Sequence, residues 1–129
     1  MKKILIDTNI YSDAMRGEKY AVNILRRNAQ VLISPVVIGE LFAGFKGGTQ
    51  EEKNKQQLYE FLSRERVVQL SISSETSEFY AFILNHLKED GTPIPTNDIR
   101  IAASALENGA AVATRDEHFS KINGLILIG

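Results

Sequence analysis

The chain of 129 residues contains no cysteine at all. This absence excludes a disulfide framework, zinc sites built from thiolates and a cysteine nucleophile. An excess of positive charge is also missing, because 15 Lys and Arg residues are set against 16 Asp and Glu residues, giving a net charge of −1. Without a global positive field, sequence-independent binding over a wide surface of duplex DNA is not expected.

Long apolar runs are lacking too. The first run, Ile4 to Ile6, follows a basic start but is too short for a signal peptide or a membrane span. We therefore expect a cytoplasmic protein without a membrane segment. The length favours one domain, residues 1–129, which buries enough surface to fold without a metal or disulfide staple.

Short apolar runs alternate with stretches of helical periodicity along the chain. Strands are predicted at residues 4–6, 31–33, 67–70, 110–113 and 125–128. Helices are predicted at residues 10–15, 18–28 and 36–45, after Gly48, across residues 79–87, and from Thr96 or Asn97 to Asn108. Strands that alternate with helices predict an α/β fold with a mostly parallel sheet.

Some helix starts are predicted more closely. Ser34 and Pro35 look like an N-cap followed by a proline in the first turn. Thr49 and Glu52 have the spacing of a capping box. Thr96 or Asn97 is expected to cap the following helix, which places an acid in its first turn.

An apolar stripe is predicted on the helix at residues 79–87. Helical spacing places these side chains on one face: Phe79, Phe82, Ile83, His86 and Leu87. A histidine on such a stripe is expected in the core or at its boundary rather than as a ligand.

Four acids have positions from which they are able to converge. Asp7 and Asp116 follow predicted strands, at the end where ligands bind in open α/β sheets. Asp98 lies in the first turn of the helix that enters the second of these strands, and Glu40 lies in the helix after the second strand. Crowded carboxylates repel, and Mg²⁺ or Mn²⁺, which take oxygen ligands, remove that conflict. The pattern is compatible with metal-assisted phosphodiester cleavage.

Structural roles explain the same acids one at a time. Asp7 is a normal helix cap, with Thr8 and Asn9 as turn residues. Asp98 supports a helix N-terminus through its charge, and Asp116 suits a turn. Spacing alone leaves the metal site and these structural roles open.

Four blocks taken together resemble a known family. They are ILIDTN at 4–9, VIGEL at 37–41, TNDIRIAA at 96–103 and ATRDEHF at 113–119. In this order, over nearly the whole chain, they resemble the four acidic motifs of PIN-domain ribonucleases, and most closely those of the VapC-type toxins of toxin–antitoxin pairs. The resemblance implies a three-layer α/β/α fold with a mostly parallel five-stranded sheet. It also implies Mg²⁺- or Mn²⁺-dependent endonucleolytic cleavage of RNA, with 5′-phosphate and 3′-hydroxyl products.

The resemblance further implies a role for particular residues. The catalytic, metal-binding acids would be Asp7, Glu40, Asp98 and Asp116. Asp7 and Asp98 would be the main direct ligands, and Glu40 or Asp116 would accept a proton from the attacking water. The residues that hold the acids or a water in place would be Thr8, Asn9, Asn97 and Thr114. The partners implied are an RNA substrate and a cognate antitoxin, and residues 50–66 and 79–87 are surfaces for a homodimer.

Two other functions are weighed against this interpretation. A haloacid-dehalogenase-like phosphatase starts with a strand ending in D-x-D, but the third position here is Asn9, so the second carboxylate is missing. A non-catalytic PIN-like module that binds protein or RNA is disfavoured by the presence of all four acids. A cleavage assay with and without EDTA separates the enzyme from the binding module.

Overall fold

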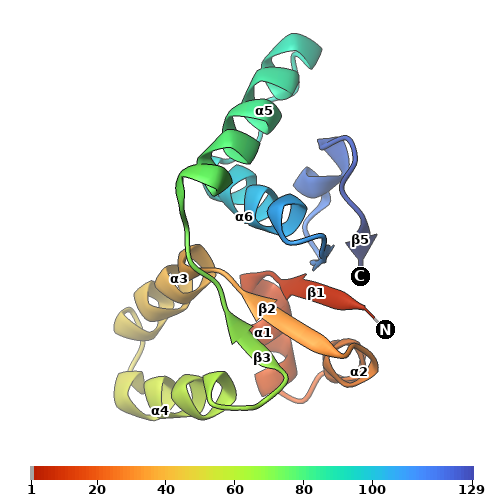
Figure 1. Cartoon of the computed structure of the whole chain (residues 1–129). Coiled ribbons are helices and arrows are strands. Elements are labelled where there is room, and N and C mark those ends of the chain that lie inside the picture. Colours follow the sequence, from red (N-terminus) through yellow and green to blue (C-terminus); the bar gives the residue numbers. More distant parts are fainter. Residues whose placement is uncertain (1) are drawn as a thin grey trace.

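A parallel five-stranded sheet is the centre of the fold. The computed structural model describes residues 2–129, and its strands pair in the order β3–β2–β1–β4–β5, all in parallel (Figure 1). The strands are β1 (Lys3–Ile6), β2 (Gln30–Ile33), β3 (Val67–Gln69), β4 (Ala111–Ala113) and β5 (Leu127–Ile128). The predicted α/β class is confirmed, although the last strand is shorter than residues 125–128.

Helices fill the connections between these strands. They are α1 (Thr8–Met15), α2 (Lys19–Arg27), α3 (Pro35–Lys46), α4 (Glu51–Leu62), α5 (Ser74–Asp90), α6 (Thr96–Glu107) and the 3₁₀ helix η1 (Glu117–Lys121). The chain steps outward from β1 to β2 and β3, then returns to place β4 on the other side of β1. Right-handed crossovers therefore place α1–α4 on one face of the sheet and α5–α6 on the other. Within residues 2–129 no helix is long and apolar enough to cross a membrane.

Strand β1 is the most enclosed element. Ile4, Leu5 and Ile6 have no exposed surface, as expected for an unbroken apolar run covered on both faces. Each such side chain contributes roughly 1.5–3 kcal/mol through its burial. On β4 the paired residues are small, with Ala111 opposite Ile4 and Ala113 opposite Ile6. The small strand residues leave room for the alanines of α6, Ala102, Ala103 and Ala105, which are fully buried.

The order of the strands reverses between β1 and β4. At such a switch point the loops leave in opposite directions and open a crevice at the carboxyl ends of the strands. The backbone N–H of Asp7 donates to the carbonyl oxygen of Ala113 at 3.0 Å, so the two strand ends are held together. Asp7 and the residues after Ala113 therefore enter the same crevice.

One predicted helix start is confirmed and two are wrong. The Ser34 hydroxyl accepts from the Val36 N–H at 3.1 Å, with Pro35 in the first turn of α3. Helix α4 begins instead after Gln50, with no side-chain cap, so Thr49 and Glu52 form no capping box. The acid in the first turn of α4, Glu51, forms ion pairs instead: its carboxylate lies 2.9 Å from Lys46 Nζ and 3.4 Å from Lys55 Nζ.

Helix α6 starts earlier than a cap at Thr96 or Asn97 would allow. Its N-cap position is Pro95, so Thr96 is helical and neither Thr96 nor Asn97 caps it. The Asn97 amide donates instead to Glu40 on another helix. The prediction fails because the Asn97 side chain would need one orientation to cap α6 and another to reach Glu40.

The stripe on α5 is only partly buried. Ile83 and Leu87 are buried, but Phe82 is 55 % exposed and His86 is exposed, with its ring centroid 4.4 Å from that of Phe82. Helix α5 extends away from the sheet, as Figure 1 shows, and packs mainly on α6. Because this part of α5 extends beyond the helix on which it packs, His86 is exposed, and the expectation that it lies in the core or at its boundary is wrong.

Candidate metal centre

Asp7 is held at the end of β1 by three donors. Its Oδ1 accepts from the Thr8 N–H at 2.8 Å, and its Oδ2 accepts from the Asn9 amide at 3.2 Å and the Thr114 hydroxyl at 2.7 Å. The residue is 5 % exposed. Asp7 is thus the N-cap of α1, as predicted, and its carboxylate is held in a fixed orientation in the crevice.

Thr114 links the ends of β1 and β4. Its hydroxyl donates to Asp7 and accepts from the Asp116 N–H at 2.9 Å. Its own N–H donates to the carbonyl oxygen of Ile128 at 3.0 Å, which ties this turn to β5. One hydroxyl therefore orients Asp7 and sets the path of the backbone that carries Asp116.

Glu40 reaches the same region from α3. Its Oε1 accepts from the Thr8 hydroxyl at 2.6 Å, and its Oε2 accepts from the Asn97 amide at 3.3 Å. The Asn97 carbonyl oxygen in turn accepts from Arg100 at 3.1 Å. Through these contacts Glu40 is positioned between the start of α1 and the start of α6.

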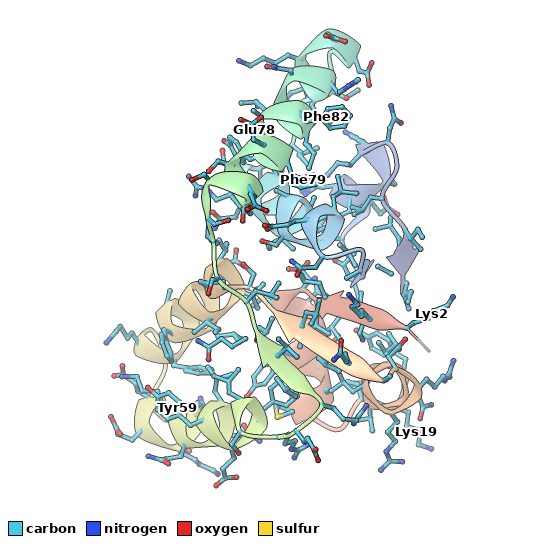
Figure 2. The ribbon with its side chains drawn as sticks, viewed as in Figure 1. Lys2, Lys19, Tyr59, Glu78, Phe79 and Phe82 are labelled. Carbon is cyan, nitrogen blue, oxygen red and sulfur yellow. The ribbon has the colours of Figure 1, made fainter. Side chains whose placement is uncertain are left out.

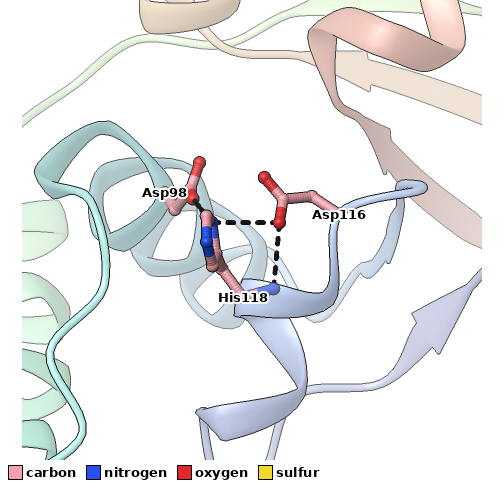
Figure 3. A group of neighbouring side chains, drawn as sticks. All are labelled: Asp98, Asp116 and His118. Atoms are coloured by element: carbon pink, nitrogen blue, oxygen red, sulfur yellow. Dashed lines mark hydrogen bonds and ion pairs between the residues drawn. The ribbon is translucent and has the colours of Figure 1, made fainter.

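The tightest group at the site contains a histidine. Three side chains each contribute one atom able to bind a metal, and these atoms lie within 4.8 Å of one another: Asp98, Asp116 and His118. His118 Nδ1 is 3.0 Å from Asp98 Oδ2 and 3.0 Å from Asp116 Oδ1 (Figure 3). Asp116 caps η1, and its Oδ1 also accepts the His118 N–H at 2.9 Å. The Asx turn therefore folds the His118 ring back onto Asp116.

Burial and neighbouring charge act on two of the acids. Burial raises the pKa of Asp7, the hydrogen bonds from Thr114 and Thr8 oppose this, and the charges of Glu40 and Asp116 add to it. Burial also raises the pKa of Asp98, the His118 hydrogen bond opposes this, and the charges of Asp116 and Asp7 raise it further. The carboxylates thus lie close enough to repel one another.

The loop before Asp116 is anchored to the far end of α1. Arg115 Nε lies 2.7 Å from Asp13 Oδ2, and the Arg115 N–H donates to the Asn9 side chain at 3.2 Å. Asp13 is buried and also pairs with Arg16 and the Tyr20 hydroxyl. The Tyr20 hydrogen bond lowers the pKa of Asp13 most, with the charges of Arg115 and Arg16 assisting. This cluster fixes the loop that carries Asp116.

Comparison with known proteins identifies the family to which this chain belongs. The profile of the PIN domain matches residues 4–125. The chain belongs to the PIN-domain family. It is 31% identical to ribonuclease VapC2 of Rickettsia felis over 128 residues, covering 95% of this chain and 94% of that protein. The expectation of a VapC-type PIN domain is thereby confirmed.

Solved structures of toxin–antitoxin complexes share the fold of this PIN domain. VapBC2 from Rickettsia felis, bound to a DNA fragment from their promoter, has a TM-score of 0.85 and 28% identity, covering 98% of this chain and 97% of that one. VapBC-1 from nontypeable Haemophilus influenzae has a TM-score of 0.84 and 26% identity, covering 98% and 96%. The predicted PIN-like α/β architecture is therefore confirmed.

The donor set of this PIN domain fits a divalent cation. Two carboxylates with raised pKa values, Asp7 and Asp98, lie in one crevice with the more exposed Asp116. Oxygen ligands of this kind suit Mg²⁺ and Mn²⁺, and a cation neutralises the mutual repulsion of the carboxylates. The acids chosen from the sequence are brought to one edge of the sheet, and their roles remain predictions.

His118 is the member of the group that the sequence interpretation missed. It belongs to the block ATRDEHF at 113–119, but no role is assigned to it from the sequence. The signal available was the D-x-H spacing of Asp116 and His118, since a capping Asp accepts from the N–H two residues on. That turn returns the third side chain toward the first, but the contact with Asp98 depends on where α6 starts.

Proposed function

We propose that this PIN domain is the toxin of a toxin–antitoxin pair, an endoribonuclease that uses Mg²⁺ or Mn²⁺. The observation that carries the proposal is the convergence of acids from β1, α3, α6 and η1 at the switch point of the sheet. Its curated relatives named ribonuclease VapC support the reaction class. RNA is the expected substrate. The cytoplasm is the expected location, because cellular RNA is available there.

We assign the cation to Asp7, Asp98 and Asp116. When bound, such a cation supplies charge neutralisation at the scissile phosphate and a more acidic water. Asp7 is held in orientation by Thr114 and Asn9, so little reorganisation is needed for its carboxylate to act. The hydrogen bonds from Thr8 and Asn97 do the same for Glu40.

Asp116 is the better placed of the two proposed proton acceptors. Both oxygens of Glu40 already accept hydrogen bonds, from Thr8 and from Asn97. On Asp116, the contacts within residues 2–129 fall on Oδ1, so Oδ2 is available to a water. A general base must lie within hydrogen-bond reach of the proton it takes. We therefore assign proton abstraction to Asp116 and orientation to Glu40.

The antitoxin is proposed from the same crevice and from the relatives. The solved structures similar to this chain include VapBC toxin–antitoxin complexes. A crevice that gathers carboxylates attracts Arg or Lys side chains, which form strong charge-assisted hydrogen bonds there. A partner that inserts such a side chain would occupy the position of the cation and block cleavage.

Cleavage of cellular RNA by the purified protein tests the reaction. We expect cleavage with Mn²⁺ or Mg²⁺ and none with excess EDTA, and we expect Asp98→Asn to abolish it. Asp90→Asn is the matched control, because Asp90 is an exposed acid at the far end of α5. Equal cleavage in EDTA, or full activity in Asp98→Asn, would contradict the proposal.

Co-expression tests the partner. We expect the product of an adjacent short reading frame to co-purify with this chain and to suppress its RNA cleavage. Failure of the two proteins to co-purify would count against a toxin–antitoxin pair while leaving the ribonuclease assignment in place. Metal-independent RNA binding without any cleavage would favour the non-catalytic module.

A further inference from the structure

The ring of His118 lies between two of the acids assigned to the cation. Nδ1 is at 3.0 Å from a carboxylate oxygen of Asp98 and at 3.0 Å from one of Asp116 (Figure 3). Asp98 comes from α6, whereas Asp116 and His118 come from the start of η1. Two separate elements thus bring two oxygens and one nitrogen to the same point.

These distances equal the spacing of neighbouring ligands around a small cation. In an octahedral site with bonds of about 2.1 Å, adjacent ligand atoms lie about 3.0 Å apart. A hydrogen bond has a similar length, but Nδ1 carries at most one hydrogen and faces two carboxylates. A cation placed among the three atoms, which lie within 4.8 Å of one another, would satisfy the arrangement more completely than one hydrogen does.

The backbone holds His118 in this position. Its N–H donates to Asp116 Oδ1 at 2.9 Å, and the next residue, Phe119, is fully buried beneath η1. The His118 side chain is 46% exposed, whereas that of Asp98 is 12% exposed. The Asp116 side chain is 31% exposed, so the imidazole is the most solvent-accessible of the three side chains.

We propose that His118 is a direct nitrogen ligand of the cation held by Asp98 and Asp116. The inference rests on the proposed function, from which it takes the presence of a divalent cation. Imidazole binds first-row transition ions well, whereas Mg²⁺ keeps oxygen ligands and water. His118 thereby makes the site prefer Mn²⁺ to Mg²⁺, and the four acids alone would not create this preference.

Pulsed EPR of the Mn²⁺-loaded protein, free of any histidine tag, tests the ligand directly. The chain has two histidines, and the other, His86, is exposed on α5. We expect a nitrogen coupling from a bound imidazole in the wild type and in His86→Gln, and its loss in His118→Gln. Labelling histidine alone with ¹⁵N should change the coupling frequency in the wild type, so the test does not depend on any variant folding.

Binding of Mn²⁺ and Mg²⁺ alone gives the second readout. His118→Gln should weaken Mn²⁺ binding at least about tenfold, and Mg²⁺ binding by a smaller factor. Bound Mn²⁺ without a histidine coupling, or equal losses for both ions, would overturn the role of His118 and leave the proposed function standing. No binding of Mn²⁺ by the wild type would overturn both.

Discussion

Thr114 Oγ1 lies 2.7 Å from Asp7 Oδ2 and donates its hydrogen to that buried carboxylate. The hydroxyl is the donor because a carboxylate only accepts, and the same oxygen also accepts from the Asp116 N–H. A threonine thus joins two acids that are 109 positions apart in the printed sequence, from residue 7 to residue 116. Its removal should affect both the fold and the metal site.

Replacing Thr114 by Val keeps the shape of the side chain and removes the hydroxyl. Asp7 then loses its shortest hydrogen bond in a buried position, which costs about 1–3 kcal/mol of unfolding free energy. We also expect Mn²⁺ affinity to fall roughly 10–100-fold, because ligand orientation is lost. Chemical denaturation and Mn²⁺ titration measure the two effects, and Thr114→Ser, which keeps the hydroxyl, should retain most of both. A Val variant with unchanged Mn²⁺ affinity would contradict the positioning role.

Stability of the metal-free protein should depend on pH in a defined direction. The pKa values of Asp7 and Asp98 are raised above the ordinary 3.8, chiefly by burial. The folded state therefore holds protons that the unfolded state has released, so the unfolding free energy falls as pH rises from 3.8 through these raised values. Denaturation curves in EDTA between pH 4 and 7 measure this, and Asp7→Asn should flatten the trend. A metal-free stability that increases over this range would contradict it.

Asp13 acts in a separate pH window. Its pKa is lowered from 3.8, mostly by the Tyr20 hydrogen bond, so its stabilising contribution is present above 3.8 and is lost as pH falls through the lowered value. Tyr20→Phe removes that donor. The variant should therefore lose less unfolding free energy than the wild type when the pH is lowered from 7 into the acid range. Denaturation curves below pH 4 test this. If the unfolding free energy of the variant depends on pH there as it does in the wild type, the role of Tyr20 is contradicted.

The exposed face of α5 is expected to form the homodimer. Phe82 is 55% exposed and lines a hollow with Phe79 and Leu106; Figure 2 shows Phe79 and Phe82 on the side of α5 toward the C-terminal segment. Phe82→Glu should convert a two-chain mass to a one-chain mass in light scattering, because a charge is not tolerated in an apolar contact. Ile126→Glu before β5, where Ile126 is 67% exposed and outside residues 50–66 and 79–87, is the control and should stay dimeric. A one-chain mass for the wild type at all concentrations would remove the dimer.

The sheet and the placement of the acids could be predicted from the sequence because their signals are local. The unbroken run at Ile4 to Ile6 demands burial on both faces, and a polar residue directly after it must lie at the edge of the sheet. The Ser34–Pro35 pair likewise specifies a helix start through its own side chain. These local signals place Asp7 and Asp116 at the end of the sheet where ligands bind. The assignment of Asp7, Glu40, Asp98 and Asp116 to one metal site depends in addition on the resemblance to PIN-domain ribonucleases.

Features that depend on distant elements could not be predicted in this way. Periodicity places Phe82 and His86 on a stripe, but it does not show that α5 extends beyond its neighbour. Asn97 has the chemistry of a cap, yet its amide is directed to Glu40, 57 positions away. The contact of His118 with Asp98 likewise depends on the packing of α6 against η1.

Melting curves test whether Asp98 belongs to a metal site, without knowledge of the substrate. Two carboxylates about 5 Å apart repel by at most roughly 3 kcal/mol at an effective dielectric of about 20. Asp98→Asn keeps the shape and removes one charge, so it should melt at a higher temperature than the wild type in EDTA. Each kcal/mol corresponds to roughly 3–6 °C for a domain of this size.

The decisive measurement is a set of melting curves for wild type and Asp98→Asn, each in EDTA and in Mn²⁺. We expect Mn²⁺ to stabilise the wild type, by about 2.7 kcal/mol at a hundredfold excess over Kd, and to stabilise Asp98→Asn much less. If Asp98 only supports the start of α6, its loss should lower the metal-free melting temperature slightly. A lower metal-free melting temperature for Asp98→Asn, together with an unchanged response to Mn²⁺, would contradict the metal site.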